Sequence, residues 1–224
     1  MILKTRQALV RGLIVATIVN SGLPGTAFAQ ATTPAAHVHL RHVAVQFRGT
    51  PDGAGLLPTA IAEAEIALQH ATLAARDPGD LDGIRRHAGH VLHALAPDRA
   101  ERGPGLGYGV TLAAERTAHY VELAMAADGG GEALSTHGPH VVTATRHALV
   151  TTERAVELAA ALLEEEDVGA ASARLEELVA SCDAIVNGVD ANGDGRVGWQ
   201  EGEGGLAQAA QHLELLRRGE GLIG

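Results

Sequence analysis

The stretch PTAIAEAEIALQHATLAARD, residues 58–77, opens with a proline and then places apolar residues three and four positions apart. This spacing puts the apolar side chains on one face of an α-helix, and a first helical turn accepts proline. Alanine is the commonest residue of the stretch, and it has the highest helix propensity of all residues. We therefore expect an amphipathic helix here, which ends at the PGD turn of residues 78–80.

The same pattern recurs along the rest of the chain. Further helices are expected at residues 81–96, 109–127, 140–166, 170–189 and 205–219. Breakers rich in glycine and proline separate them, including GPGLGYG and DGGG. No run of alternating β-branched residues indicates a strand. The fold class that we predict is all-α, an antiparallel helical bundle with short turns between neighbouring helices.

The amino terminus has the three parts of a secretory signal peptide. Positive residues come first, an apolar run follows at residues 12–19, and AFA stands at residues 27–29. The apolar run is shorter than the roughly 20 residues that a membrane-spanning helix needs. We expect residues 1–29 to be removed, which leaves an exported protein without a membrane span. The bacterial periplasm is the simplest destination, and an uncleaved anchor is the alternative.

The charge balance limits the partners of the protein. The full chain has a formal net charge of −10, and loss of Lys4, Arg6 and Arg11 with the signal peptide brings it to about −13. Such a surface disfavours nucleic acid and anionic lipid, and it attracts cations. Cys182 is the single cysteine, which excludes an internal disulfide, a thiolate zinc cluster and a haem attachment motif. Its apolar helical surroundings favour a buried structural thiol.

Near the carboxyl end, DANGDGRVGWQE (residues 190–201) has oxygen-bearing side chains at its first, third, fifth and twelfth positions and glycine at its sixth. In an EF-hand calcium loop, short acidic and amide side chains at these positions point inward, and the glycine permits a sharp turn. The chain resembles the EF-hand family over residues 172–217. The resemblance implies a helix-loop-helix that binds Ca²⁺ through Asp190, Asn192, Asp194, the backbone carbonyl of Arg196, and Glu201.

The chain departs from the EF-hand pattern in two ways. EF-hands usually work in pairs, but the sequence contains one good loop, so we expect either weak binding or pairing with a second copy in a homodimer. The exiting helix is also weakened by Gly202, Gly204 and Gly205. The alternative interpretation is a solvated turn between two helices.

Two segments repeat a spacing of histidines around a turn. The first set is His70, His87 and His90, and the second set is His119, His137 and His140. The first two members of each set are about equally distant from the turn, so they face each other across a hairpin. The third member shares a helix face with the second. Three imidazoles are therefore expected to converge in each hairpin, where Cu²⁺ or Zn²⁺ would bind, although Pro139 is expected to disturb the second set.

Residues 58–150 are similar, through this spacing of alanine and histidine, to the histidine-bearing helical repeats of exported small metal-binding proteins. The resemblance implies binding of copper and other divalent ions. The alternative is that these histidines are polar surface groups or hydrogen-bonded core residues. HVHLRH, residues 37–42, would add a further transition-metal site on the amino-terminal arm through His37, His39 and His42. The structural histidines are expected to be His93, His147 and His212.

Four segments are expected: a signal peptide (1–29), a flexible amino-terminal arm (30–57), a helical bundle with two histidine hairpins (58–171) and an EF-hand helix-loop-helix (172–224). Within the arm, AAHVHLRHVAVQF (residues 35–47) is either a short helix or an extended segment. Common catalytic motifs are missing, so we predict that the protein is not an enzyme. The leading hypothesis is an exported protein whose calcium loop stabilises or switches the bundle. The alternatives are sequestration or delivery of copper or zinc by the hairpins, and a non-catalytic interaction module.

Overall fold

The computed structural model describes residues 33–100 and 102–223, and this part of the chain is helical without a strand. The predicted signal peptide lies outside the described residues. The helices are α1 (Ala35–Ala44), α2 (Leu56–Ala74), α3 (Leu81–Leu95), α4 (Val110–Ala126), α5 (Glu132–Glu164), α6 (Val168–Asn187) and α7 (Leu206–Gly219), with short 3-10 turns η1 (Pro51–Gly53) and η2 (Pro97–Arg99). The all-α prediction is confirmed. None of these helices combines the length and the apolar character that crossing a membrane requires.

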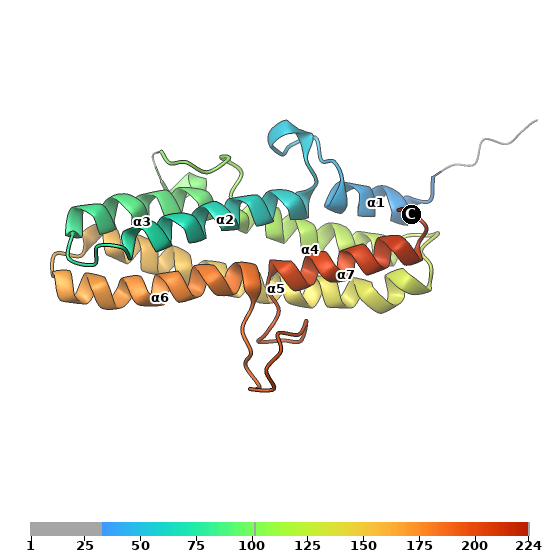
Figure 1. Cartoon of the computed structure of the whole chain (residues 1–224). Helices are drawn as coiled ribbons and strands as arrows, with labels where there is room; N and C mark the ends of the chain where they lie inside the picture. Colours follow the sequence, from blue (N-terminus) through green and yellow to red (C-terminus); the bar gives the residue numbers. More distant parts are fainter. Residues whose placement is uncertain (1–32, 101, 224) are drawn as a thin grey trace, which may run out of the picture. The chain divides into compact units, whose positions relative to one another are not determined.

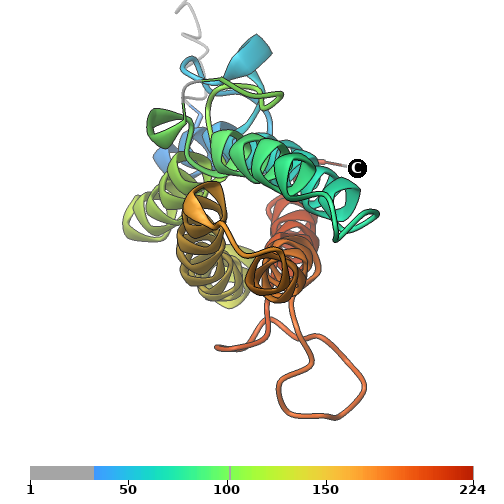
Figure 2. The ribbon, with the colours of Figure 1, turned by 90° about the vertical axis from the view of Figure 1, so that its left-hand side faces the viewer.

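The long helix α5 packs against four other helices, α3, α4, α6 and α7 (Figure 1). Its amino-terminal part lies against α4 and α7, and its carboxyl-terminal part lies against α3 and α6. Helix α1 packs on α4, while α2 contacts α3, α4 and α6 and so joins the two groups. Helices α6 and α7 follow each other along one side of the bundle. The segment between them, residues 188–205, projects away from it (Figures 1 and 2).

Small side chains form much of the core. The buried face of α2, for example, carries Ala60, Ala64, Ala67 and Ala71. Small residues let helix backbones approach one another closely. Just before α7, a Cβ added at Gly204 would lie 2.9 Å from the Cα atom of Ala144 on α5. This glycine, which we expected only to weaken the exiting helix, therefore permits the close contact between the projecting segment and α5.

The amino-terminal segment is not a flexible arm throughout, because the helix is the alternative that is observed within residues 35–47. Residues 35–44 form α1, in which Ala36, Leu40 and Val43 are fully buried and the helix packs on α4. The helical spacing of these three buried residues is the feature that favours the helix over an extended segment. Residues 33–224 also form one compact unit, so no boundary separates the predicted bundle from the predicted EF-hand segment.

Helix α5 also begins earlier than predicted and runs through Pro139. A proline inside a helix removes one backbone hydrogen bond and costs about 3 kcal/mol. Leu134 before it and Val141 after it are both buried. Their packing against neighbouring helices offsets the cost, so His137 and His140 lie on one continuous helix.

Candidate metal sites

The first histidine cluster joins α2 and α3. The Nδ1 atom of His70 lies 3.0 Å from Nδ1 of His87 and 3.3 Å from Nδ1 of His90. A short turn connects the two helices, and the side chain of Asp80 caps α3 by accepting the backbone N–H of Gly83. The ligand atoms of the three histidines lie within 4.8 Å of one another. The structure thus brings together the first predicted set.

The second cluster joins α5 and α7. The Nδ1 atom of His212 lies 3.2 Å from Nδ1 of His137 and 3.3 Å from Nδ1 of His140. These ligand atoms also lie within 4.8 Å of one another. The end of α7 is held at the start of α5, because the carboxylate of Glu220 accepts the backbone N–H groups of Gly131 and Leu134. The two helices are therefore fixed side by side where the histidines meet.

The second cluster differs from the predicted set in one member. His119 is exposed, because it lies outside the buried face of α4. His212, which we expected to be structural, takes its place beside the pair on α5. A sequence signal for His212 exists: ALQH at residues 67–70 and AAQH at residues 209–212 match around the central histidine of each cluster. The spacing of histidines around a hairpin turn does not reveal His212, because α7 is not the sequence neighbour of α5.

The two clusters repeat one arrangement of rings. The centroid of the His70 ring lies 5.3 Å from that of His87 and 4.7 Å from that of His90, and the interplanar angles are 29° and 80°. The centroid of the His212 ring lies 5.4 Å from that of His137 and 4.7 Å from that of His140, and the interplanar angles are 38° and 79°. In both clusters a central histidine therefore faces two histidines that lie three residues apart on the neighbouring helix.

The donor atoms suit a transition metal. Imidazole nitrogen binds zinc at about 2.0–2.1 Å, so two ligands of a tetrahedral ion lie about 3.3 Å apart. The Nδ1 distances of 3.0 to 3.3 Å come close to this value. Histidines that bind a metal must be neutral. In five of the six clustered histidines the pKa is lowered, mainly by burial and to a smaller extent by the positive charge of neighbouring histidines or of Arg86. These five are His70, His87, His90, His140 and His212.

Trp199 covers the second cluster. Its indole stacks on His140, with centroids 3.7 Å apart and an interplanar angle of 18°. The same indole lies 6.2 Å from the ring of His212. Trp199 is the single tryptophan of the chain, and it belongs to the projecting segment 188–205. This segment therefore contacts one of the two histidine clusters directly.

The predicted calcium loop lies in the same segment. The carboxylate of Asp190 accepts three backbone N–H groups at 2.8 to 3.1 Å, from Gly193, Asp194 and Gly195. Glu201 lies before the start of α7 and lines a hollow with Arg146 and His147. Within the described residues, the groups of three or more metal-ligating side chains that gather within 4.8 Å are the two histidine clusters. The carboxylates of the loop are thus not gathered around one point.

Other histidines and the cysteine have structural contacts. Nδ1 of His147 lies 2.8 Å from the backbone oxygen of Gly204, which ties α5 to the end of the projecting segment. His37 on α1 lies 3.1 Å from the carboxylate of Glu220. Cys182 is fully buried, and burial raises the pKa of its thiol to about 12. As predicted, this cysteine is a structural thiol that stays protonated at neutral pH.

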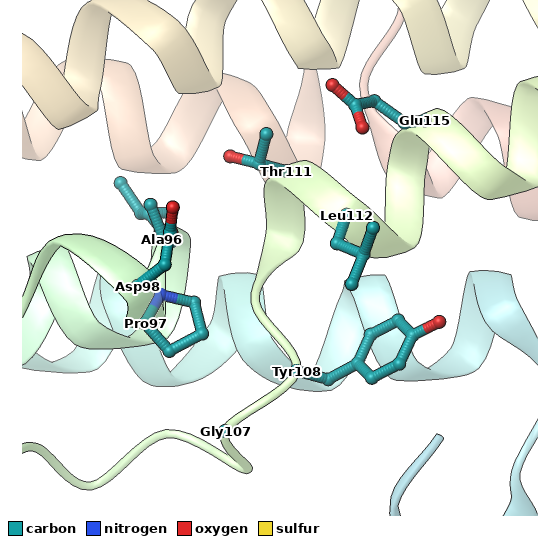
Figure 3. A pocket seen from close by; sticks show the side chains of 9 residues that line it. Ala96, Pro97, Asp98, Gly107, Tyr108, Thr111, Leu112 and Glu115 are labelled. Carbon is teal, nitrogen blue, oxygen red and sulfur yellow. The ribbon is translucent and has the colours of Figure 1, made fainter. Parts of the chain in front are cut away.

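A separate cavity of about 710 Å³ lies where the end of α3 and η2 meet the start of α4 (Figure 3). Its lining includes the apolar surfaces of Pro97, Tyr108 and Leu112, together with the carboxylates of Asp98 and Glu115. None of the clustered histidines lines it. The cavity and the histidine clusters are therefore distinct features of the bundle.

No known family model matches the chain, and neither a curated protein nor a solved structure matches it. The resemblances to EF-hands and to exported metal-binding repeats therefore stay predictions. The histidine clusters have to be interpreted from their own geometry and chemistry.

Proposed function

We propose that the protein binds copper or zinc at two three-histidine sites and that it sequesters or delivers the metal. The repetition of the arrangement supports this proposal most strongly. Two helix pairs, α2–α3 and α5–α7, hold three imidazoles in the same geometry. Imidazole ligands suit copper and zinc, whereas calcium takes oxygen ligands. Histidines serving only as polar surface or core groups have no reason to converge twice in this way.

Storage or delivery fits the clusters better than catalysis does. Each triad supplies three of the four ligands that zinc usually takes. All six histidines are partly exposed, so an ion can enter and leave through solvent. Two equivalent sites raise the capacity of one chain, whereas a catalytic site is usually a single centre in an enclosed pocket. We therefore retain the expectation that the protein is not an enzyme.

Counting bound ions tests the proposal. The purified protein is dialysed against Zn²⁺, and the zinc per chain is measured by elemental mass spectrometry. We expect two tightly bound ions in the wild type, one in His70→Ala, one in His212→Ala and none in the double variant. His119→Ala is the matched control and should keep both ions, because this exposed histidine belongs to neither cluster. A wild type without zinc, or a double variant with the full count, would overturn the proposal.

Calcium binding by residues 190–201 is the second candidate function. It is favoured by the three backbone N–H groups that fix the carboxylate of Asp190, the first predicted ligand. In this proposal, Ca²⁺ draws Glu201 toward Asp190 and Asp194 and stabilises or switches the projecting segment beside Trp199. Calorimetric titration with Ca²⁺ should give a signal that Glu201→Gln abolishes. Glu176→Gln, an exposed change on α6, should leave it unchanged, and an unaltered signal in Glu201→Gln would exclude the loop.

Export and pairing are two further parts of the proposal. Cleavage after residue 29 implies a mature chain that begins at Gln30, which the intact mass of the exported protein measures. Pairing of the single loop with a second copy implies a dimer that depends on calcium, which analytical ultracentrifugation measures. An exported chain that keeps residues 1–29 would contradict the cleavage. A mass in solution that does not change when calcium is added would contradict the calcium-dependent dimer.

A further inference from the structure

A third cluster of rings joins α1 and α4. The rings of His39 and His42 have their centroids 5.8 and 5.2 Å from the ring of Tyr120, and 6.4 Å from each other. The corresponding distances around His212 in the second metal cluster are 5.4, 4.7 and 5.8 Å. The interplanar angles are 52°, 89° and 71° in the third cluster, and 38°, 79° and 75° in the second. Tyr120 therefore occupies the place of the central histidine.

The sequence carries the same repetition. The paired histidines of the three clusters fall in HLRHV, HAGHV and HGPHV, at residues 39–43, 87–91 and 137–141. The valine that ends each pentapeptide is fully buried. The equivalent valine thus faces the core in each of α1, α3 and α5. This common orientation turns the two histidines of each pentapeptide toward a neighbouring helix. Helix α1 is in this respect a third copy of the metal-binding helix face.

The nitrogens of the third cluster lack partners. The Nδ1 atoms of His39 and His42 are both buried, and neither has a hydrogen-bond partner. Buried polar atoms without a partner are uncommon and need an explanation. In the other two clusters, Nδ1 atoms are the ones that converge. A metal ion bound to both nitrogens would satisfy them.

We propose that His39 and His42 form a third binding site for the same transition metal, weaker than the other two because Tyr120 stands where the central histidine would be. This proposal rests on the proposed function of the two three-histidine sites. The competing explanation is aromatic packing alone, since Phe47 lies 5.6 Å from the ring of His42 and 5.3 Å from that of Tyr120. Packing alone predicts that no metal binds at α1.

The test uses a chain in which the two stronger sites are removed. His70, His90, His140 and His212 are replaced by alanine, which leaves one histidine in each of these clusters and the third cluster unchanged. Calorimetric titration with Zn²⁺ should show one remaining site. Its affinity should be lower than that of the wild-type sites by more than about ten-fold, because even the loss of an outer-shell partner weakens metal binding by that factor. Adding His39→Gln should abolish the remaining binding.

A gain of binding gives an independent measurement in the otherwise unchanged chain. Tyr120→His completes the triad, so the count of tightly bound zinc ions should rise from two to three. A silent titration of the four-alanine chain, with its helical circular dichroism intact, would overturn the third site, and so would a count that stays at two in Tyr120→His. Absence of zinc from the wild type would instead show that the proposed function itself is wrong, and it would be seen before these variants are made.

Discussion

Glu63 shows how one side chain organises the bundle away from the histidine clusters. It is fully buried on α2, and its carboxylate accepts the backbone N–H groups of Leu106, Tyr108 and Gly109, each at 2.9 Å. These residues form the glycine-rich connection that leads into α4. The first N–H groups of a helix and of its approach have no helical partners. A buried carboxylate with three charge-assisted hydrogen bonds therefore fixes where α4 begins.

Replacing Glu63 with alanine should destabilise the protein strongly. The change leaves three backbone N–H groups without their acceptor, and we expect the free energy of unfolding to fall by about 3 kcal/mol. Urea denaturation measures this difference. Glu65→Ala, an exposed change two residues along the same helix, should cost less than about 0.5 kcal/mol. Equal effects of the two changes would show that the buried carboxylate does not hold the connection.

Acid should destabilise the metal-free protein through its histidine clusters. Burial lowers the pKa of His70, His87, His90 and His212 below the ordinary value of 6.5 in the folded chain, while the unfolded chain keeps the ordinary value. As the pH falls past 6.5, the unfolded state binds more protons than the folded state, so the free energy of unfolding decreases. Denaturation of metal-free protein at a series of pH values should show this decrease beginning near pH 6.5.

The variant His70→Ala/His212→Ala provides the control for this pH dependence. It lacks two of the groups whose pKa is lowered, so its stability should fall less steeply over the same range of pH. Identical slopes in the variant and the wild type would show that other groups cause the acid sensitivity.

Among single residues, the first triad could be predicted from sequence and the second only in part. His70, His87 and His90 lie on two helices joined by a short turn, so their spacing decides which side chains face each other. His212 comes from α7, and its neighbour α5 is separated from it by α6 and the projecting segment. Spacing carries no information about helices that are not consecutive. Glu63 was missed for a related reason, because the loop that buries it lies far away in the sequence.

The helices themselves could mostly be predicted, because periodicity and breakers act locally. The expected helix at residues 81–96 is observed as Leu81–Leu95, and that at residues 109–127 as Val110–Ala126. Helix α1 could be predicted only as one of two alternatives, since its apolar face has only three buried residues and glycine-rich segments follow it. The start of α5 was missed because proline was expected to break the helix. Burial of residues on both sides of the proline decided otherwise, and burial depends on helices elsewhere in the chain.

Pro139→Ala should therefore stabilise α5. Pro139 is exposed, so the change removes little packing, and it restores a backbone N–H that the helix can use. We expect the free energy of unfolding to rise by about 1 to 3 kcal/mol, with both zinc ions retained. Thermal and urea denaturation measure the gain, and Thr136→Ala, at another exposed position of α5, should change stability by about 0.5 kcal/mol at most. A loss of stability would mean that the proline shapes α5 in a way that the bundle requires.

In the molecule as a whole, the two three-histidine sites lie on different parts of the bundle. The first uses α3, which packs along the carboxyl-terminal part of α5, and the second uses the amino-terminal part of α5 itself. They share no residue, so changes at one should add to changes at the other. An ion at either site joins two helices of the folded state, and it should raise the free energy of unfolding by about 2.7 kcal/mol when its concentration is 100 times its dissociation constant.

Trp199 can distinguish the two proposed sites, because it is the single tryptophan and stacks on His140 of the second cluster. Cu²⁺ quenches the fluorescence of an indole that it approaches closely, so titration with Cu²⁺ should quench Trp199 as the second site fills. His212→Ala should remove this high-affinity quenching. His70→Ala should leave it unchanged, because the histidine rings that lie close to Trp199 within the described residues are those of His140 and His212. If His70→Ala instead weakened the quenching as much as His212→Ala, the two sites would be coupled through α5, and the bundle would respond to metal as one cooperative unit.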